Sequence, residues 1–575
     1  MASALAMPAH AQITQERLEN AGAEPHNWLL QLGNYASHSY SSLDQINRDN
    51  VADLRAMWTI PITTALANSA DNLFGGAQLE MRPLVVDGMM YFNDPWGIVY
   101  GVDISNMSNP RIMFVTDPAM ARDAGEIPVS RGVALWDTNI WANLADGRVT
   151  ATDMNTGELL IDVQIARTEA GTDFDIGEGF TASPLPAQGL IMVGQSKGDW
   201  ATRGYLAAVD AESGEEVWRT YTIPGPGEPG HETWADEAGT AWRTGGGSLW
   251  QVGSYDPAQN ITIWGTANPV PMFDPEYRPG DNLYTNSALA FDVDDGSIVW
   301  YFQYTPNESW DYDEIGVHAL IDAEVDGEMR QMVVHFARNG YYYRLDRTDG
   351  TFIGGTQYVE QITWTAGLDP KTGMPVEYDP DLDLQVYLPE TRQTRDGNPS
   401  IAFCPTLLGG VRWQPTAYNP ETGINYVSGI DGCSAITVGP EEPTPGQIFI
   451  GADFAAPAPF DLAAPHGQIV GVDVMTGEIT ARLLLPQPSE SGVLATAGGL
   501  VFHGGRDGRI TAHNDETLEE LWAFPTNIGI KAAPMTFAVD GQQYVAIIAG
   551  TNGGGGGAPE LANQQTGAML YVFGL

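Results

Sequence analysis

Lysine is nearly absent from this chain of 575 residues, where it occurs only as Lys197, Lys371 and Lys531. Lysine and arginine together number 26 against 73 aspartates and glutamates, so the formal charge at pH 7 is −47. This shortage of positive charge argues against binding to nucleic acid or to an anionic membrane surface, because both attract basic patches. We expect an acidic, heavily hydrated surface instead.

Long hydrophobic runs are also missing. No stretch of about 18 apolar residues occurs, so the sequence predicts no membrane-spanning helix. Near the N-terminus, residues 9–11 (Ala-His-Ala) have the small-x-small form of a signal-peptide cleavage site, but no basic region and no full apolar region precede them. We interpret residues 1–12 as the remnant of an export signal or a disordered start, and we expect a periplasmic protein.

Cysteine occurs only twice, as Cys404 and Cys433. In an exported protein an even pair of cysteines favours one disulfide. The Cys-x-x-Cys-His sequence that attaches a c-type haem is absent, which excludes a haem of that type in this chain.

Turns, by contrast, are abundant, and one short unit recurs eight times. An apolar run ends in Asp or Asn, a Gly or equivalent turn residue follows, and a second apolar run often ends in Trp. Asp or Asn and Gly at these offsets cap a hairpin turn and supply its positive φ. The copies are at Asp103, Asp153, Asp210, Asp292, Asp346, Asn419, Asp473 and Asn514.

Eight copies spaced roughly 40–80 residues apart are typical of a β-propeller with one four-stranded blade per copy. Nothing between the copies indicates a long helix. We therefore predict an all-β, eight-bladed propeller that forms a single domain over residues 13–575, with a run of β-sandwiches as the structural alternative. We expect the strand 567–574 to pair with an N-terminal strand at 56–63, because ring closure removes an open sheet edge.

Three long insertions interrupt the repeat at 221–247, 264–284 and 356–402, and loops of such length usually carry function. Shortly after the second insertion, Asp311 and Asp313 alternate with Trp310 and Tyr312 in the stretch 310–313. Residues two apart share a face of an extended chain, and two carboxylates can converge on a hard cation. The alternative is a solvated acidic turn.

Several motifs in a fixed order resemble the quinoprotein alcohol dehydrogenases, which use pyrroloquinoline quinone (PQQ), in their soluble form without a haem domain. They are residues 33–58, GGGSLW, GTANPVP, RPGDNLYT, WDYDEIG, ARNGYYYRLDR and QQYVAIIAG. The resemblance covers almost the whole chain. It implies an eight-bladed propeller with PQQ and a divalent or trivalent metal at its centre.

This resemblance assigns chemical roles. It implies that Asp311 accepts the alcohol proton while hydride passes to C5 of PQQ, and that Arg338 stabilises charge on the quinone oxygens. The metal, Ca²⁺ or a lanthanide(III) ion, would bind Asp199, Asn268, Asp311 and Asp313 and polarise the quinone. Asp199 replaces the longer Glu of most relatives. Asp313 marks lanthanide use in relatives, and its added charge favours a trivalent ion.

The resemblance also implies a PQQ-binding set. Trp250 would form the floor under the PQQ ring, because a planar cofactor needs a flat apolar face. A core tryptophan of a blade is the alternative for Trp250, and ordinary turn or strand residues are the alternative for the rest. The other expected contacts are Glu80, Arg131, Thr181, Ser196, Lys197, Gly198, Ser248, Arg338, Arg412 and Trp413.

The cysteines differ from the family pattern. Relatives carry a disulfide between adjacent cysteines over one PQQ face, where this chain has Gly125 and Glu126. Cys404 and Cys433 match a second family bridge, which links strands of one blade.

The pocket residues differ too. Met272 stands where relatives specific for small alcohols have a Trp, and the glycine run 553–557, next to Asn552, replaces an aromatic segment. We therefore expect a substrate pocket with Met272 and Asn552 that admits alcohols larger than methanol or ethanol, such as a secondary ring alcohol or a polyol.

The predicted function is oxidation of such an alcohol to an aldehyde or ketone. The electrons are expected to pass to a separate soluble cytochrome c or a dye, since no haem domain follows, and the protein is expected to be a monomer or homodimer. A non-catalytic propeller scaffold is one alternative, although Asp311, Asn268, Arg338 and Trp250 occurring together argue against it. A hydrolase or lyase with a central metal is another, although it leaves Trp250 unexplained.

Overall fold

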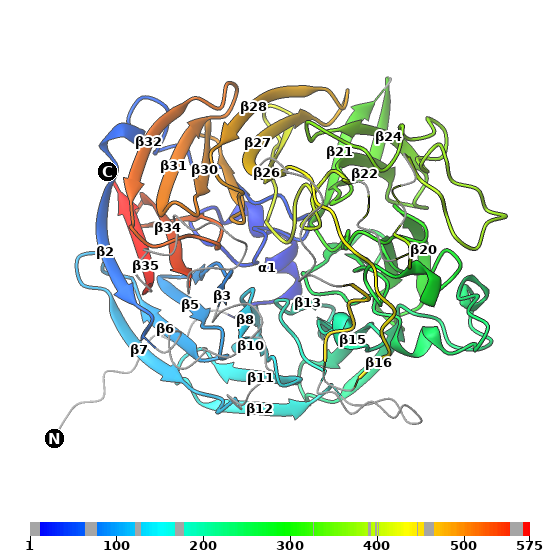
Figure 1. Ribbon diagram of the computed structural model, residues 1–575. Helices are drawn as coiled ribbons and strands as arrows, with labels where there is room; N and C mark the ends of the chain where they lie inside the picture. The colour runs from blue at the N-terminus through cyan, green and yellow to red at the C-terminus, as the bar shows by residue number, and fades with distance from the viewer. Residues whose placement is uncertain are drawn as a thin grey trace.

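The computed structural model describes residues 12–63, 78–120, 128–166, 178–325, 327–388, 391, 393–396, 400, 402–444, 447–452, 465–551 and 567–575. These residues form eight sheets that radiate from a common centre like the blades of a propeller (Figure 1). The predicted all-β, eight-bladed propeller is therefore confirmed.

Seven blades are each made of four strands that follow one another in the chain. The first three are β4 (Leu84–Val86), β5 (Met89–Asn93), β6 (Val99–Asp103) and β7 (Arg111–Thr116); β9 (Val133–Trp136), β10 (Asn139–Asn143), β11 (Arg148–Asp153) and β12 (Leu159–Gln164); and β13 (Leu185–Ala187), β14 (Leu190–Gly194), β15 (Tyr205–Asp210) and β16 (Glu216–Tyr221). The fourth and fifth are β17 (Ser254–Asp256), β18 (Ile261–Gly265), β19 (Ser287–Asp292) and β20 (Ile298–Gln303), and β21 (His318–Val325), β22 (Glu328–Phe336), β23 (Tyr341–Asp346) and β24 (Phe352–Gln357). The sixth and seventh are β25 (Ala417–Asn419), β26 (Ile424–Asp431), β27 (His466–Asp473) and β28 (Ile479–Leu485), and β29 (Val493–Thr496), β30 (Leu500–Gly504), β31 (Arg509–Asn514) and β32 (Glu520–Pro525), with β1 (Tyr40–Ser41) parallel to β29.

The eighth blade joins the two ends of the chain. It contains β33 (Met535–Val539), β34 (Gln542–Thr551), β35 (Gly567–Gly574) and, as its outer strand, β2 (Arg55–Pro61). β2 runs antiparallel to β35, with Arg55 opposite Gly574 and Pro61 opposite Met569. The predicted pairing of the two terminal strands is confirmed, and it closes the ring. β3 (Gln78–Leu79) and β8 (Val129–Ser130) extend this sheet.

The repeated Asp-containing unit forms the predicted turn. In the second blade, Oδ1 of Asp153 accepts hydrogen bonds from the backbone N–H groups of Asn155 (2.9 Å) and Thr156 (2.7 Å), and Gly157 has a φ of 74°. The side chain therefore caps the turn while the glycine supplies the left-handed backbone that other residues adopt at a cost.

The assignment of one copy to each blade is wrong. Seven copies join the third strand of a blade to its fourth, but Asn419 joins the first and second strands of the sixth blade, which also contains Asp473. None of the eight copies falls in the eighth blade, because that blade takes its outer strand from the N-terminal segment. The number of blades is nevertheless eight.

The tryptophan that often ends the unit connects neighbouring blades. Nε1 of Trp218 donates to the carbonyl of Val293, 2.9 Å away, in the turn of the next blade, and Trp300 donates in the same way to Arg347 at 3.0 Å. A Cβ atom on Gly296 would lie 2.4 Å from Trp218. The turn glycine thus lets the ring of the preceding blade pack against the backbone.

The two ends of the ring differ. At one end the N-terminal helix α1 (Gln15–Glu19) lies near the middle of the ring in Figure 1 and contacts hairpins between first and second strands. Arg17 donates to Asp87 at 2.8 Å, and the Gln15 side chain accepts from the backbone of Gln188 at 2.8 Å.

Short 3-10 helices are η1 (Ala21–Ala23), η2 (Val51–Asp53), η4 (Gly198–Trp200), η5 (His231–Thr233), η6 (Ala241–Thr244) and η7 (Pro275–Tyr277).

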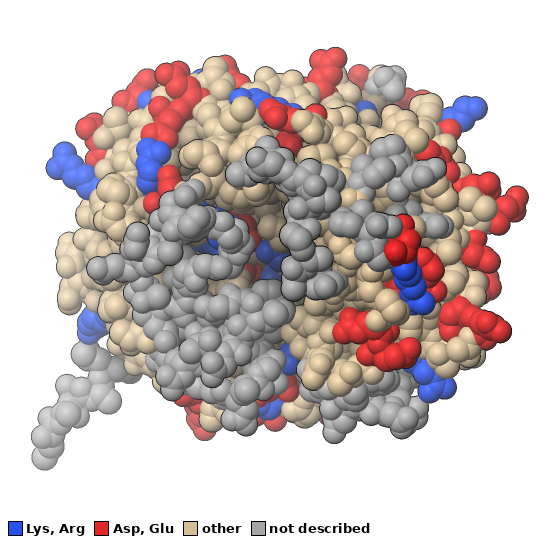
Figure 2. Space-filling view, in the orientation of Figure 1, with Lys and Arg blue, Asp and Glu red and all other residues tan. Residues whose placement is uncertain are grey.

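The helices of the described ranges are all too short or too polar to cross a membrane. Figure 2 shows red acidic side chains spread round the periphery of one face, with fewer blue ones. Near the middle of this face is a hollow in which basic and acidic atoms are visible.

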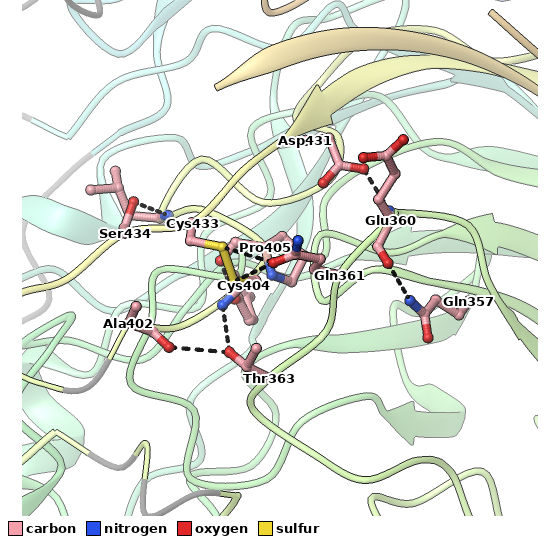
Figure 3. Close-up of a disulfide and its surroundings, with 12 residues drawn as sticks. Gln357, Glu360, Gln361, Thr363, Ala402, Cys404, Pro405, Asp431, Cys433 and Ser434 are labelled. Atoms are coloured by element: carbon pink, nitrogen blue, oxygen red, sulfur yellow. Dashed lines mark hydrogen bonds between the residues drawn. A yellow bond between two sulfur atoms is a disulfide. The ribbon is translucent and has the colours of Figure 1, made fainter. Parts of the chain in front are cut away.

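The predicted disulfide is present between Cys404 and Cys433 (Figure 3). The expected link between two strands of one blade is wrong. Cys404 lies in the loop before β25 and Cys433 lies in the loop after β26. Backbone pairing of Phe403 with Ser434 accompanies the bridge. Gly125 and Glu126 lie outside the described residues.

Candidate active site

The predicted cofactor, metal and pocket residues that lie within the described ranges belong to one end of the ring. Strand direction alternates within a blade, so the segment before the first strand and the connection from the second strand to the third lie at the same end. Segments before first strands carry Glu80, Arg131, Thr181, Ser248, Trp250, Asp311, Asp313, Arg412 and Trp413. Connections from second to third strands carry Ser196, Lys197, Gly198, Asp199, Asn268, Met272 and Arg338.

A cavity of about 240 Å³ lies at this end, on the opposite side from α1. Its predicted lining residues are Glu80, Arg131, Thr181, Ser196, Asp199, Trp250, Met272, Asp311, Asp313, Arg412 and Trp413. Lys197, Gly198, Ser248, Asn268 and Arg338 are buried but are not among the residues that line the cavity. Asn552 lies outside the described residues. The structure adds Gln78, Val129, Trp200, Leu407, Leu408, Ile448 and Ile450 to the lining.

The stretch 310–313 is a buried loop, not the solvated turn that was its alternative. Trp310 and Tyr312 are fully buried; Trp310 Nε1 donates to the carbonyl of Thr391 (3.0 Å) and the Tyr312 hydroxyl to that of Pro405 (2.7 Å). The intervening carboxylates, Asp311 and Asp313, line the cavity. The two aromatic side chains therefore pack into the protein interior, while the two carboxylates face the cavity.

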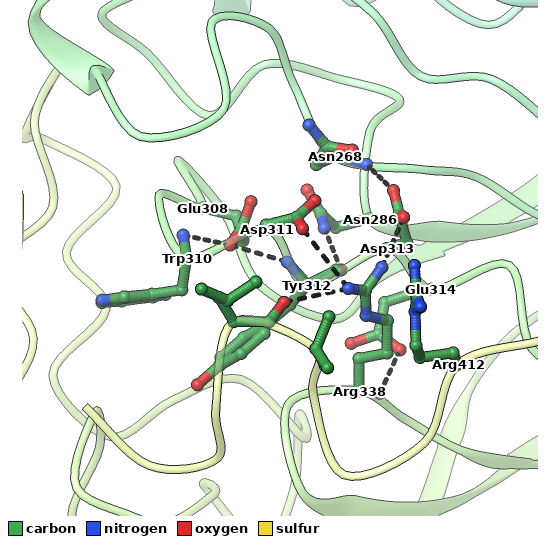
Figure 4. Close-up of polar contacts among 12 residues, drawn as sticks. Asn268, Asn286, Glu308, Trp310, Asp311, Tyr312, Asp313, Glu314, Arg338 and Arg412 are labelled. Atoms are coloured by element: carbon green, nitrogen blue, oxygen red, sulfur yellow. Dashed lines mark hydrogen bonds and ion pairs between the residues drawn. The ribbon is translucent and has the colours of Figure 1, made fainter. Parts of the chain in front are cut away.

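Glu308 shapes this loop, and the sequence analysis did not identify Glu308 as part of the site. Its buried carboxylate accepts hydrogen bonds from the backbone N–H groups of Trp310 and Tyr312, the latter at 3.0 Å (Figure 4). Asp311 between them has a φ of 68°, a left-handed conformation that costs a residue other than glycine on the order of 1 kcal/mol. The two hydrogen bonds hold Asp311 in that conformation, with its side chain 16% exposed.

Arg338 joins the two carboxylates. Its Nη2 lies 3.5 Å from Oδ2 of Asp311, and its Nη1 pairs with Oδ2 of Asp313 (Figure 4). The other oxygen of Asp313 accepts from the backbone N–H of Asn268 at 2.9 Å. Burial raises the pKa of Asp311 well above its usual value; Arg338 opposes this rise, and the charges of Asp313 and Asp199 add to it.

The donor set fits a hard cation. Burial and the charge of Asp313 raise the pKa of Asp199 to about 7, against a hydrogen bond with Asn268 that lowers it. Oδ1 of Asn268 is buried and has no hydrogen-bond partner among the described residues. Carboxylate and amide oxygens are the ligands that calcium and similar ions bind. The carboxylates of Asp199, Asp311 and Asp313 do not offer three oxygens within 4.8 Å of one another.

A basic part of the cavity lining is built around Arg131. Its Nη2 pairs with the buried Glu80 at 2.8 Å, and its Nη1 donates to the Thr181 hydroxyl (2.6 Å) and to the carbonyl of Trp250 (2.9 Å). The guanidinium lies 4.6 Å from the ring centroid of Trp250 and 5.5 Å from that of Trp413. Arg131 therefore orients the two tryptophan rings as well as supplying positive charge.

A second basic group surrounds Glu490, which the sequence did not indicate. Its Oε1 pairs with Arg412 at 2.9 Å, and its Oε2 lies 3.3 Å from Arg506 and 3.4 Å from Lys531. Arg412 and Lys531 also face the Trp413 ring, at 4.7 and 5.2 Å from its centroid. Lys531 is one of only three lysines, and this rarity was the one signal that could have found it.

The described residues fit an anionic planar cofactor such as PQQ. The Nε groups of Arg131 and Arg412 are buried and have no hydrogen-bond partner within the described ranges. Because unsatisfied cationic donors are costly, they indicate a missing anion. Trp250 and Trp413, with ring centroids 6.2 Å apart, supply apolar faces beside them.

The apolar rim of the cavity was not predicted, Met272 excepted. Leu407 and Leu408 follow Cys404, and Ile448 and Ile450 come from another loop. Isolated apolar residues in long loops carry no periodic pattern, so no signal in the sequence could have found them.

Comparison with known proteins identifies the family. A family described as PQQ glucose/ethanol/alcohol dehydrogenase, β-propeller domain, matches residues 28–360 and 461–545. The quinoprotein alcohol dehydrogenase PedH of Pseudomonas putida is 31% identical over 593 residues, which cover 99% of this chain and 95% of that protein. The quinohemoprotein alcohol dehydrogenase of Comamonas testosteroni is 32% identical, over 96% of this chain and 77% of that protein.

Solved structures agree. A europium-containing methanol dehydrogenase superposes with a TM-score of 0.85 at 29% identity, covering 97% of this chain and 100% of that chain. The quinohemoprotein alcohol dehydrogenase ADHIIG of Pseudomonas putida HK5 gives 0.86 at 29% identity, over 99% of this chain and 83% of that chain. The chain therefore belongs to the quinoprotein (PQQ-dependent) alcohol dehydrogenase family and is an oxidoreductase.

Proposed function

We propose that this chain oxidises an alcohol bulkier than methanol or ethanol to an aldehyde or ketone, with Asp311 as the base. The observation that carries the proposal is the cavity itself, which Asp311, Arg131 and Trp250 line together. PQQ, when bound there with a metal ion that polarises it, would supply the two-electron oxidising power.

The cofactor would be held by the basic side of the cavity. Arg131 and Arg412 offer free Nε donors to its carboxylates, while Thr181, Ser196 and Ser248 stand nearby as neutral hydrogen-bonding groups. Trp250 and Trp413 would cover one face of the ring. Lys197 and Gly198 belong to the buried segment around Ser196, and a Cβ on Gly198 would lie 2.9 Å from the Ser248 hydroxyl.

Asp311 can accept the hydroxyl proton only while it is ionised. Burial raises its pKa well above the usual value, which favours the protonated form. Arg338 counteracts this shift, and a cation bound by Asp199, Asn268 and Asp313 would counteract it further. In this proposal Arg338 is a catalytic residue, because its guanidinium would also stabilise the negative charge that develops on the quinone oxygens.

We infer that the metal is a lanthanide(III) ion rather than Ca²⁺. Asp313 adds a second carboxylate beside Asp311, and a higher ligand charge favours a trivalent ion. The similarity to a europium-containing methanol dehydrogenase supports the same choice. Asp199 is one methylene shorter than glutamate, so its bond to the ion requires a closer backbone or a bridging water.

The proposed substrate is a bulky, largely apolar alcohol. Met272, Trp200, Leu407, Ile448 and Ile450 contribute apolar surface to the cavity. Such a lining favours a secondary ring alcohol over a polyol, because it leaves the extra hydroxyl groups of a polyol without partners.

The electron acceptor would be a separate soluble cytochrome c in the periplasm. These 575 residues contain no Cys-x-x-Cys-His sequence, so they do not themselves attach a haem of the c type. A net charge of −47 would steer a basic partner to its surface.

Replacing Asp311 by Asn tests the proposal. We expect kcat with a dye acceptor to fall by about 10²–10⁴-fold, the usual contribution of a general base, while PQQ remains bound. Turnover is measured over an alcohol panel, and PQQ binding by absorbance after reconstitution. Asp349→Asn, in an exposed turn, is the control and should leave both unchanged. Retained turnover in Asp311→Asn would remove Asp311 from the base role.

A further inference from the structure

Outside the cavity, three potential metal ligands meet at the seam between the fifth and sixth blades. Glu360 follows β24, Asp431 ends β26, and His466 begins β27 directly opposite Asp431. One ligand atom from each lies within 4.8 Å of the other two. Figure 3 shows Asp431 and Glu360 beside the disulfide of Cys404 and Cys433.

The imidazole of this group is not satisfied by its surroundings. Nε2 of His466 is buried and makes no hydrogen bond to any described residue, and it lies 3.9 Å from Oε2 of Glu360. Asp431 is only 2% exposed. Its Oδ2 accepts a hydrogen bond from the backbone N–H of Glu360 at 2.6 Å. A buried imidazole nitrogen without a partner, close to a buried carboxylate, indicates a missing ligand.

A second Glu–His–Asp group in the same chain shows how such residues look when no ion is needed. Glu24, His26 and Asp87 are equally close together, but Arg17 lies among them. Its Nη2 is 2.8 Å from Glu24 and 2.8 Å from Asp87, so one guanidinium neutralises both carboxylates.

The seam group has no such cation in contact. Arg482 acts on Asp431 only through its charge, because its Nη1 donates to the Gln468 side chain and its Nη2 to the carbonyl of Tyr358 at 2.7 Å. The position that Arg17 fills in the N-terminal group therefore has no counterpart among the described residues near Glu360, Asp431 and His466.

We propose that Glu360, Asp431 and His466 bind a first-row divalent transition-metal ion of the Zn²⁺ type. One imidazole nitrogen with two carboxylate oxygens suits such an ion, whereas Ca²⁺ and lanthanides prefer oxygen alone. Donors around tetrahedral Zn²⁺ are about 3.4 Å apart for bonds of about 2.1 Å, so the 3.9 Å between His466 and Glu360 needs only a small side-chain movement. Water completes the coordination on the exposed side.

Such an ion would connect two blades behind the wall of the cavity. Two residues after Asp431, Cys433 holds Cys404, and the neighbouring Ser434 hydroxyl accepts from the backbone N–H of Leu407 at 3.1 Å. Leu407 lines the cavity. The metal would thus brace the loop that carries an apolar part of the pocket, in addition to the disulfide.

The test measures Zn²⁺ bound by the full-length protein after its PQQ and active-site metal have been loaded. Equilibrium dialysis against Zn²⁺, with metal analysis, should show one more Zn²⁺ per chain for the wild type than for His466→Ala. Glu360→Gln, at a side chain 43% exposed, changes the site without disturbing the core and should weaken Zn²⁺ binding by about 100-fold. Zn²⁺ should also raise the Tm of the wild type and not that of either variant.

His26→Ala is the matched control, because it alters the group that Arg17 already neutralises, and it should bind as much Zn²⁺ as the wild type. Equal Zn²⁺ content and equal Tm shifts in wild type, His466→Ala and Glu360→Gln would overturn the proposal and leave a histidine–carboxylate ion pair only.

Discussion

The lining of the central cavity has an acidic part and a basic part, which we call the acidic wall and the basic wall. Each wall has too few groups of the other charge to neutralise it. The acidic wall consists of Asp199, Asp311 and Asp313, with Glu308 and Glu314 behind them, and Arg338 is the cation that pairs with it. The basic wall consists of Arg131, which pairs with Glu80, and Arg412, which pairs with Glu490; Lys531 lies behind it, beside Glu490.

The titration of the two walls shows the contrast. On the acidic wall, burial and like charge raise the pKa of Asp199 to about 7, and burial raises that of Glu314 to about 8. On the basic wall, burial acts to raise the pKa of Glu490, but Lys531, Arg506 and Arg412 lower it to about 2. Arg338 alone does not neutralise the three carboxylates of the acidic wall, and on the basic wall the Nε groups of Arg131 and Arg412 have no partner among the described residues. A metal ion and a carboxylate-bearing cofactor would provide the missing charges.

The largest expected effect comes from removing the anion of the basic wall. Glu490→Gln leaves Arg412, Arg506 and Lys531 around a neutral side chain, so we expect the free energy of unfolding to fall by on the order of 3 kcal/mol at neutral pH. Urea unfolding measures it. Glu478→Gln, in an exposed turn, is the control and should change little.

The sign of the pH dependence follows from the lowered pKa. The stabilisation by Glu490 is fully present above its unfolded pKa of 4.5 and is lost as pH falls through the folded pKa of about 2. The difference between wild type and Glu490→Gln should therefore shrink from pH 4.5 downwards. A difference that stays constant over this range would show that Glu490 acts through packing rather than charge.

Local chemistry explains how much of this site the sequence could predict. The alternation of Trp310, Asp311, Tyr312 and Asp313 is a property of one short stretch, and the structure keeps it. The partners of the basic wall are different, because Glu490 and Lys531 come from blades far along the chain from Arg131. Only the closed ring brings them together, so no local pattern marks them.

The prediction of the fold had the same limit, because local patterns do not show how distant segments come together. The strand pairs and turns follow from alternating apolar residues and Asp–Gly signals, and their number led to eight blades. The copy at Asn419 carries the same turn residues as the others, yet it joins a first strand to a second. Turn chemistry specifies a hairpin, but it does not specify which hairpin of the blade is formed.

The acidic wall is tested by Asp313→Ala. We expect the preference for a light lanthanide over Ca²⁺ to fall by about 10–100-fold, because one carboxylate is lost from the set around the ion, while PQQ binding stays within about twofold. Metal affinity and dye-linked activity with each ion measure this.

Asp313→Asn separates charge from hydrogen bonding in that experiment. Asn can still accept from the backbone N–H of Asn268, as Asp313 does at 2.9 Å, but it carries no charge. If the variant with Asn keeps the lanthanide preference, then Asp313 contributes through its hydrogen bond and the proposed metal selection fails.

The smallest effect is expected from a substitution in the uncharged rim of the cavity. Such a substitution should leave the charges of the acidic wall and the basic wall unchanged. Met272 is 8% exposed and lines the cavity, so Met272→Trp should fill space and lower kcat/KM for bulky ring alcohols by about tenfold relative to ethanol. Met329→Trp, at a side chain 70% exposed, is the control. Because Met272 is uncharged, metal preference and PQQ binding should remain those of the wild type. An unchanged substrate ratio would place the alcohol elsewhere than at Met272, whereas a changed metal preference would show that the rim and the acidic wall are coupled.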